Sequence, residues 1–131
     1  MDVKHKTAAE PLISIVDDDS SVRRSTRRLL SSSGLRVEAF ASAEDFMRSG
    51  RVNETCCLVL DLSMPGMGGL GLQRHLAETG WRIPIVFLTA RASEEEERRA
   101  MVAGAASFLR KPVDKETLLQ AIHAALGPVP G

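Results

Sequence analysis

Two aspartate-bearing segments carry the residue types best suited to chemistry in this chain. The apolar run 58–60 (LVL) ends in Asp61, and the apolar run 12–16 (LISIV) leads into Asp17 and Asp18. Continuous apolar runs of this length are typical of strands buried on both faces of a parallel sheet. The segment 64–69 (MPGMGG) cannot continue a strand, because proline lacks a backbone donor and glycine favours turns. Each carboxylate is therefore predicted to lie where a strand opens into a loop.

Two more polar side chains follow strand-like segments farther along the chain. The segment 83–90 (IPIVFLTA) is rich in β-branched and aromatic residues and brings Thr89 to its end. The short strand expected at 107–109 is followed by Lys111. The carboxyl ends of parallel strands lie at one edge of a sheet, where ligands bind in open α/β folds. The following side chains are therefore expected to converge at one site: Asp17, Asp18, Asp61, Thr89 and Lys111.

The carboxylates of such a site need positive charge among them. Carboxylates about 4 Å apart repel one another by about 4 kcal/mol per pair at an effective dielectric constant of about 20. Lys111 supplies one positive charge, and a divalent cation supplies more. Carboxylates with a backbone carbonyl, water and phosphate oxygens suit Mg²⁺. A zinc site is disfavoured because no histidine or cysteine is placed there.

This set of groups suits the chemistry of a phosphoryl group. Phosphoryl transfer requires an oxygen nucleophile in line with the phosphorus and positive charge around the equatorial oxygens, which makes Asp61 the predicted acceptor. Taken singly, each residue has a common structural role: a strand-end aspartate often caps a helix, and a strand threonine reflects β-propensity. A lysine before proline usually lies at the surface. The position of all of them at the same end of alternating units favours phosphate or metal chemistry.

The elements that position these residues alternate between strands and helices. Strands are predicted at 12–16, 36–40, 58–60, 83–90 and 107–109, and helices after Asp19 or Ser20, from Ser42, over 68–79, from Ser93 and from Asp114. Such alternation indicates an α/β fold with a five-stranded parallel sheet covered on both faces. The doubly wound, flavodoxin-like order 2-1-3-4-5 is the common solution. The arginines at 23, 24, 27 and 28 are interpreted as a solvated helix face.

Length and composition indicate one domain. In the 131 residues we expect a flexible tail at 1–11, a domain at 12–126, and a tail or the start of a linker at 127–131. The 17 basic and 17 acidic residues balance, so no basic excess favours nucleic acid. The adjacent Cys56 and Cys57, placed at the start of the strand that leads to Asp61, would point to opposite sheet faces, which disfavours a bond between them. A reducing, cytoplasmic location is expected, since no signal peptide and no apolar run of about 18 residues is present.

Four segments resemble a known family over nearly the whole chain. The stretches LISIVDDD, LVLDLSMPGMGG, VFLTA and FLRKPV are similar in type, order and spacing to the receiver domains of bacterial two-component response regulators. The resemblance implies that Asp61 is the phosphorylated residue. It also implies that Mg²⁺ is held by Asp18, Asp61 and the backbone carbonyl of Ser63, while Asp17 acts through water.

The resemblance assigns further residues to the response to phosphorylation. Thr89 corresponds to the switch hydroxyl, and Lys111 to the lysine that precedes a cis Pro112. Phe108 occupies the aromatic switch position, although an ordinary core role for this side chain is equally open. Two departures leave the lifetime of the phosphoaspartate open: Ser63 stands where many receivers have a longer polar residue, and Arg91 follows Thr89 by two. Both residues would line the path of the hydrolytic water.

The resemblance also implies partners. A sensor histidine kinase would donate the phosphoryl group, and the protein would catalyse only its own phosphorylation and dephosphorylation. A phosphorylation-dependent homodimer is expected through the fourth helix, fifth strand and fifth helix, near Arg98, Arg99, Met101 and Arg110. The stretches VDDDSSVR, VFLTA and KPV look most like the nitrogen-fixation regulator type, whose receivers usually precede a helix-turn-helix output domain. Control of transcription, with DNA bound only through an output domain outside these residues, is therefore the expected function.

Two other functions stay open at this point. The chain could be a stand-alone receiver or an adaptor that binds partner proteins without phosphate. It could also be a metal-dependent aspartyl phosphatase, which likewise uses an aspartate at the end of a parallel strand. Such enzymes need a second acid two residues after the nucleophile, and here that position is Ser63, so this alternative is disfavoured.

Overall fold

Strands and helices alternate along the part of the chain that the structure describes. A computed structural model describes residues 11–127, so the tails expected at 1–11 and 127–131 lie almost wholly outside the described residues. The strands are β1 (Leu12–Val16), β2 (Arg36–Phe40), β3 (Thr55–Leu60), β4 (Ile85–Thr89) and β5 (Ser107–Arg110). The helices are α2 (Ser20–Ser32), α3 (Ala43–Arg48), α4 (Gly69–Glu78), α5 (Glu94–Val102) and α6 (Lys115–Leu126), with a short 3₁₀ helix η1 (Val52–Glu54).

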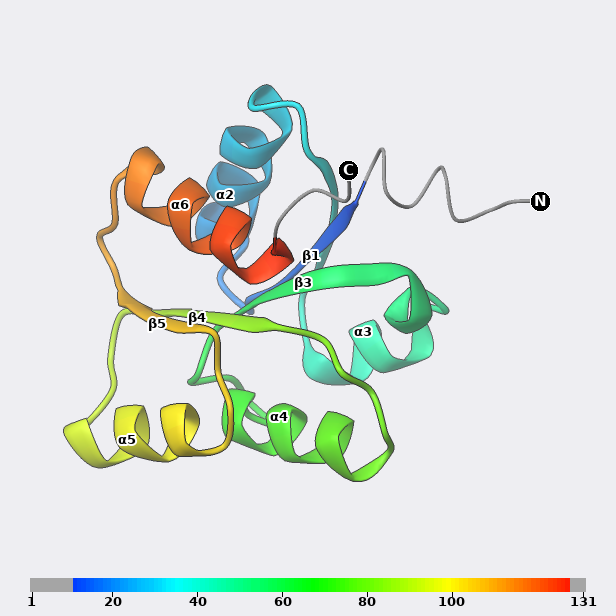
Figure 1. The fold of residues 1–131 in the computed structure, drawn as a ribbon, viewed down its shortest axis with the longest axis vertical. Coiled ribbons are helices and arrows are strands. Elements are labelled where there is room, and N and C mark those ends of the chain that lie inside the picture. The colour runs from blue at the N-terminus through cyan, green and yellow to red at the C-terminus, as the bar shows by residue number, and fades with distance from the viewer. Residues whose placement is uncertain (1–10, 128–131) are drawn as a thin grey trace.

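The five strands form one parallel sheet, as the alternation predicted. Their order is β2-β1-β3-β4-β5, and every neighbouring pair is parallel. Helices α2 and α6 cover one face of the sheet, and α3, α4 and α5 cover the other (Figure 1). None of the described helices is long and apolar enough to cross a membrane.

The apolar core lies in two layers, one on each side of the sheet. Within β3, Leu58 and Leu60 pack in the layer under α3, α4 and α5, whereas Cys57 and Val59 pack in the layer under α2 and α6. Both layers are needed because side chains along a strand point alternately to opposite faces. The two cysteines are free thiols, and burial raises the pKa of Cys57 to about 12.

Several element boundaries differ from the sequence prediction by a few residues, including β5, which extends to Arg110. The strand expected at 83–90 is confined to Ile85–Thr89, and the helix expected at 68–79 runs from Gly69 to Glu78. Strand β3 begins at Thr55, three residues before the apolar run that signals it, because pairing with β1 extends it. The expected caps are present: Asp19 caps α2, and Ser93 with Glu96 forms a capping box.

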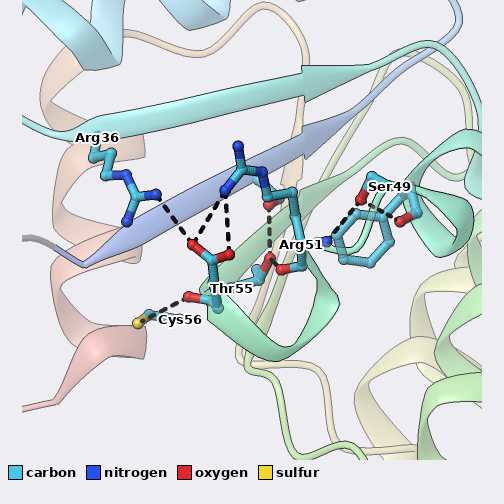
Figure 2. Close-up of polar contacts among 8 residues, drawn as sticks. Arg36, Ser49, Arg51, Thr55 and Cys56 are labelled. Atoms are coloured by element: carbon cyan, nitrogen blue, oxygen red, sulfur yellow. Dashed lines mark hydrogen bonds and ion pairs between the residues drawn. The ribbon is translucent and has the colours of Figure 1, made fainter. Parts of the chain in front are cut away.

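Polar contacts around η1 fix the start of β3. The Glu54 carboxylate lies between two guanidinium groups, 3.1 Å from Arg36 Nη2 and 3.1 Å from Arg51 Nη1 (Figure 2). The Thr55 hydroxyl donates to the Arg51 carbonyl oxygen at 2.8 Å. The buried Ser14 hydroxyl, 2.7 Å from Thr55 Oγ1, must then be the donor to Thr55, because a hydroxyl has one proton. These contacts anchor β3 beside β1 at the end of the sheet opposite its carboxyl edge.

Helix α4 begins in close contact with the backbone that follows β3. A Cβ atom on Gly69 would lie 2.5 Å from the Asp61 carbonyl oxygen and 2.9 Å from Leu62 Cα. The Gly69 N–H also donates to the Leu62 carbonyl oxygen at 2.9 Å. Only glycine fits this approach without a shift of the backbone, so the start of α4 is fixed directly against the residue that carries the candidate chemistry.

Replacing Gly69 with alanine is expected to lower the free energy of unfolding by about 1–3 kcal/mol, the usual cost of forcing extra atoms into a packed site. Gly71→Ala in the same helix is the control, because its Cβ would meet only the flexible Met67 side chain, at 3.2 Å. That control should be neutral or gain up to about 1 kcal/mol from helix propensity. Urea denaturation followed by circular dichroism measures both, and equal stability of the two variants would contradict this reading of the contact.

Candidate functional site

Three carboxylates gather at the carboxyl edge of the central strands. Asp17 and Asp18 follow β1, Asp61 follows the neighbouring β3, and one oxygen atom from each lies within 4.8 Å of the others. Asp17 and Asp61 are buried, with exposed fractions of 3% and 8%, whereas Asp18 is exposed. The convergence of these three residues, predicted from their places after apolar runs, is thus present in the fold.

Lys111 reaches this cluster from the end of β5 and pairs with Asp17. Its Nζ atom donates to Asp17 Oδ2 at 2.8 Å, and both side chains are largely buried. The peptide bond between Lys111 and Pro112 is cis, as the resemblance implied. The ammonium therefore bonds directly to one of the early acids, and its charge acts on Asp61 across a longer distance.

Two further contacts hold Asp17 in place. Its other carboxylate oxygen, Oδ1, accepts a hydrogen bond from the Asp19 N–H at 2.9 Å. Its backbone carbonyl accepts a hydrogen bond from Arg23 Nη1 at 2.7 Å. Sequence analysis placed Arg23 on a solvated helix face and missed this contact. The only signal in the sequence is that Arg23 lies one turn into the helix that Asp19 caps.

The environment of Asp61 raises the pKa of its carboxyl group. Burial raises the pKa of Asp61, and the Asp17 carboxylate raises it further. The Lys111 ammonium, the Thr89 hydroxyl and a backbone hydrogen bond from Ser63 each lower this pKa, but the net direction is upward. A nearby cation would lower this pKa, because positive charge stabilises a carboxylate.

Thr89 offers one proton to two acceptors. The side chain is fully buried, and its hydroxyl donates to the Arg91 carbonyl oxygen at 3.1 Å. The Asp61 carboxylate is the alternative acceptor, and a hydrogen bond there lowers the pKa of Asp61. Since the hydroxyl has a single proton, a stronger acceptor at Asp61 would draw Thr89 away from the loop after β4.

Phe108 and Arg110 belong to β5, which lies beside β4 and the loop that follows it. The half-buried Phe108 ring packs against Phe87 with ring centroids 5.6 Å apart, and the Arg110 guanidinium lies 5.5 Å from the centroid of Phe108. Arg110 also donates to the Ala92 carbonyl oxygen and to Glu97 Oε1, each at 2.8 Å. The acidic run 94–97 lies in the first turn of α5, where negative charge stabilises a helix N-terminus. The Glu97 pair shows that this run also ties α5 to β5.

The remaining residues singled out from the sequence lie on loops. Ser63 is exposed on the loop after β3, and its backbone lowers the pKa of Asp61. Arg91 is exposed on the loop after β4. Ser63 thus follows the strand that leads to Asp61, and Arg91 follows the strand that ends in Thr89.

The donor set of the cluster fits a hard divalent cation. The three candidate ligand atoms are all carboxylate oxygens, with no imidazole or thiolate among them. Against these three negative charges the described residues place the Lys111 ammonium and, on the backbone side of Asp17, the Arg23 guanidinium. When the positive charges of both side chains are counted, the three carboxylates still leave a net negative charge at the site. Mg²⁺ and Ca²⁺ both prefer oxygen ligands, and Mg²⁺ is commonly bound by one or two carboxylates with water and phosphate oxygens.

Comparisons with known proteins cover most of the chain. The family model described as the response regulator receiver domain matches residues 13–123. The chain is 42% identical over 127 residues to the response regulator protein TmoT of Ectopseudomonas mendocina, covering 97% of this chain and 58% of that protein. It is 37% identical over 115 residues to the transcriptional regulatory protein FixJ of Azorhizobium caulinodans, covering 88% of this chain and 54% of that protein.

A solved structure shows the same fold. The crystal structure described as FixJ-N superposes with a TM-score of 0.82 at 31% sequence identity, covering 93% of this chain and 98% of that one. The chain spans about half the length of the curated relatives it matches.

In metal-free protein, the Asp61 carboxyl group is expected to titrate above the usual range for aspartate. Lys111→Met should raise the pKa of Asp61 further, because it removes a positive charge that lowers this pKa. With a higher pKa, the ionised form is lost at a higher pH as the solution is acidified. Carboxyl-carbon NMR measures the titration directly.

Lys115→Met is the matched control, since Lys115 is exposed at the start of α6 and should leave the Asp61 titration unchanged. An Asp61 pKa in Lys111→Met at or below that of the unsubstituted protein would show that the ammonium does not act on Asp61.

Proposed function

Because the chain belongs to the response regulator receiver domain family, a phosphoacceptor signalling module, we propose that it accepts a phosphoryl group on Asp61. The P–N bond of a phosphohistidine on a sensor kinase breaks, a bond forms between phosphorus and an Asp61 oxygen, and the histidine nitrogen takes up a proton. One observation carries this proposal. The carboxylates of Asp17, Asp18 and Asp61 gather within 4.8 Å, beside an ammonium bonded to Asp17 at 2.8 Å.

The acidic cluster is of the kind typical of the receiver Mg²⁺ site. We assign Asp18, Asp61 and the backbone carbonyl of Ser63 as ligands, with Asp17 acting through water. Asp17 suits the indirect role because each of its carboxylate oxygens already accepts a hydrogen bond, from the Asp19 N–H and from Lys111 Nζ. When bound, the cation supplies positive charge that offsets the charge of the phosphoryl oxygens.

Lys111 and Thr89 are the proposed partners of the new phosphoryl oxygens. Lys111 is already beside the cluster, and Thr89 carries the proton that now serves the Arg91 carbonyl. Movement of Thr89 toward Asp61 would vacate space next to β4, into which the half-buried Phe108 ring could turn. Ser63 and Arg91 are proposed to control the access of water to the phosphoaspartate, since both are exposed on the adjoining loops.

Residues 12–126 are proposed as the receiver unit of a transcriptional regulator, with 127–131 beginning a linker. The support is that FixJ of A. caulinodans, a transcriptional regulatory protein, is about twice as long as the matched region. DNA would be bound only by an output domain outside this chain. Because the phosphohistidine donor is formed from ATP, we place the exchange with the cognate sensor kinase in the cytoplasm.

With Mg²⁺ and acetyl phosphate, the protein is expected to gain one phosphoryl group, detected by intact-mass spectrometry. Asp61→Asn should abolish the gain, because an amide is not a nucleophile for phosphorus. Asp45→Asn is the matched control, since Asp45 is exposed on α3 and pairs only with Arg48, at 3.1 Å. Undiminished labelling of Asp61→Asn would move the acceptor elsewhere, and no labelling of the unsubstituted protein would favour an adaptor that binds without phosphate.

Phosphorylation is proposed to promote a homodimer through α5, β5 and α6. Exposed apolar side chains lie on α5, with Met101 43% and Val102 77% exposed, next to Arg98 and Arg99. Light scattering should give a larger mass with beryllium fluoride and Mg²⁺ than without them. Met101→Glu should keep the uptake of phosphate but remain at the smaller mass. An unchanged mass of the unsubstituted protein would contradict the dimer.

A further inference from the structure

A side chain of α3 reaches across to the loop that follows β3. Glu44, in the first turn of α3, accepts a hydrogen bond at its Oε2 atom from the backbone N–H of Met67, at 3.0 Å. Met67 lies 23 residues away in sequence, on the loop between Asp61 and α4. No other described helix forms a side-chain hydrogen bond to the backbone of this loop, 62–68. The contact therefore joins two elements that neighbour each other only through the fold.

The loop backbone is shaped to this carboxylate. Gly66 has a φ of +73°, which L side chains rarely adopt, and a Cβ there would lie 3.0 Å from Glu44 Oε2. The absence of a side chain lets the turn pass close to the carboxylate, with the next residue, Met67, donating its N–H. The same hydrogen bond lowers the pKa of Glu44, so the carboxylate is ionised at neutral pH.

The loop's other contacts are mainly apolar: Leu62 is buried in the core, and Met64 and Met67 pack against it. Residue 65 is proline and residues 66 and 68 are glycines, and Ser63 is exposed. Yet this loop carries the Ser63 backbone, whose hydrogen bond lowers the pKa of Asp61 and whose carbonyl is the proposed Mg²⁺ ligand. Residues 63, 65 and 66 are exposed, so the hydrogen bond from Met67 to a carboxylate outside the loop adds a point of attachment where the loop has little core contact of its own.

We propose that Glu44 is a positioning residue for the phosphoacceptor loop, holding residues 62–68 so that the Ser63 backbone stays beside Asp61. This inference rests on the proposed function for its consequence, but the tether itself is a property of the fold. Glu44 acts through the Met67 N–H and does not reach the reacting atoms. Groups that orient metal ligands from outside typically change metal affinity or activity about 10- to 100-fold when they are removed.

The test compares three variants on α3. Glu44→Ala removes the acceptor, and Glu44→Gln keeps an oxygen that can accept from Met67. Asp45→Ala is the matched control, because it removes the same charge from the same helical turn while its carboxylate pairs only with Arg48 of its own helix. Amide hydrogen exchange at Met67, followed by NMR in metal-free protein, reports the tether. Mg²⁺ titration followed by amide shifts, and the rate of phosphorylation by acetyl phosphate, report its consequence.

In Glu44→Ala, exchange at Met67 is expected to accelerate about tenfold, since the Met67 N–H loses the acceptor that protects it. Mg²⁺ affinity and phosphorylation rate should each fall about tenfold. Glu44→Gln should recover most of each loss, and Asp45→Ala should match the unsubstituted protein.

Unchanged exchange at Met67 in Glu44→Ala would overturn the tether. Faster exchange with Mg²⁺ affinity and phosphorylation rate equal to those of Asp45→Ala would overturn the positioning role. A Glu44→Gln variant as impaired as Glu44→Ala would assign the effect to charge instead of the hydrogen bond, and would also overturn it. Failure of the unsubstituted protein to take up phosphate would instead count against the proposed function, because exchange and Mg²⁺ binding are measured without phosphate.

Discussion

Repulsion among three carboxylates is the constraint on which the functional end of this molecule depends. Asp17, Asp18 and Asp61 hold ligand atoms within 4.8 Å of one another, and two of the three side chains are buried. At about 4 Å each pair costs about 4 kcal/mol at an effective dielectric constant of about 20. The Lys111 ammonium offsets part of this by bonding to Asp17, and burial leaves Asp61 with a raised pKa. The cluster would therefore be stabilised by a cation bound among its carboxylates.

The sheet makes such an arrangement possible because it fixes where the acids must lie. Strands β1 and β3 are neighbours near the middle of the sheet, and apolar layers pack against both faces of them. A strand buried on both faces cannot slip in register without moving its apolar side chains, so the residue after its last apolar position is placed firmly. The approach of Gly69 to the Asp61 carbonyl then fixes the start of the next helix. Apolar burial on both faces of the sheet thus stabilises a fold that places like charges close together.

Sequence patterns could predict the elements because their signals are local. Apolar runs indicated the strands, and the caps at Asp19 and Ser93 were recognisable from residues three or fewer positions apart. Thr55 was not predicted as part of β3, because it joins the strand through pairing with β1 and hydroxyl contacts with Ser14 and Arg51 and not through an apolar pattern. Convergence of the three acids was predictable, since parallel strands present their carboxyl ends at one edge.

Contacts made by long charged side chains were not predictable in the same way. Arg23 bonds to the Asp17 carbonyl, Arg110 to the Ala92 carbonyl and Glu44 to the Met67 N–H. Each partner is a backbone group on a loop whose position depends on the whole fold. A flexible side chain with several rotamers has no sequence signal for which distant backbone group it will meet. These three contacts all hold backbone that adjoins the acidic cluster or the loop after β4.

The loop after β4 shows how a local change at Asp61 could be transmitted under the proposed function. Thr89 donates to the Arg91 carbonyl, and Arg110 donates to the next carbonyl, that of Ala92, while it also pairs with Glu97 on α5. A phosphoryl group that attracts both Thr89 and Lys111 offers two charge-assisted hydrogen bonds of about 1.5–3 kcal/mol each. Their sum approaches the roughly 5.5 kcal/mol that carries an equilibrium from 1:99 to 99:1. Once Thr89 has left, the Arg110 contacts with Ala92 and Glu97 and the capping box of Ser93 would still join this loop to α5, so a movement of the loop would be passed to α5.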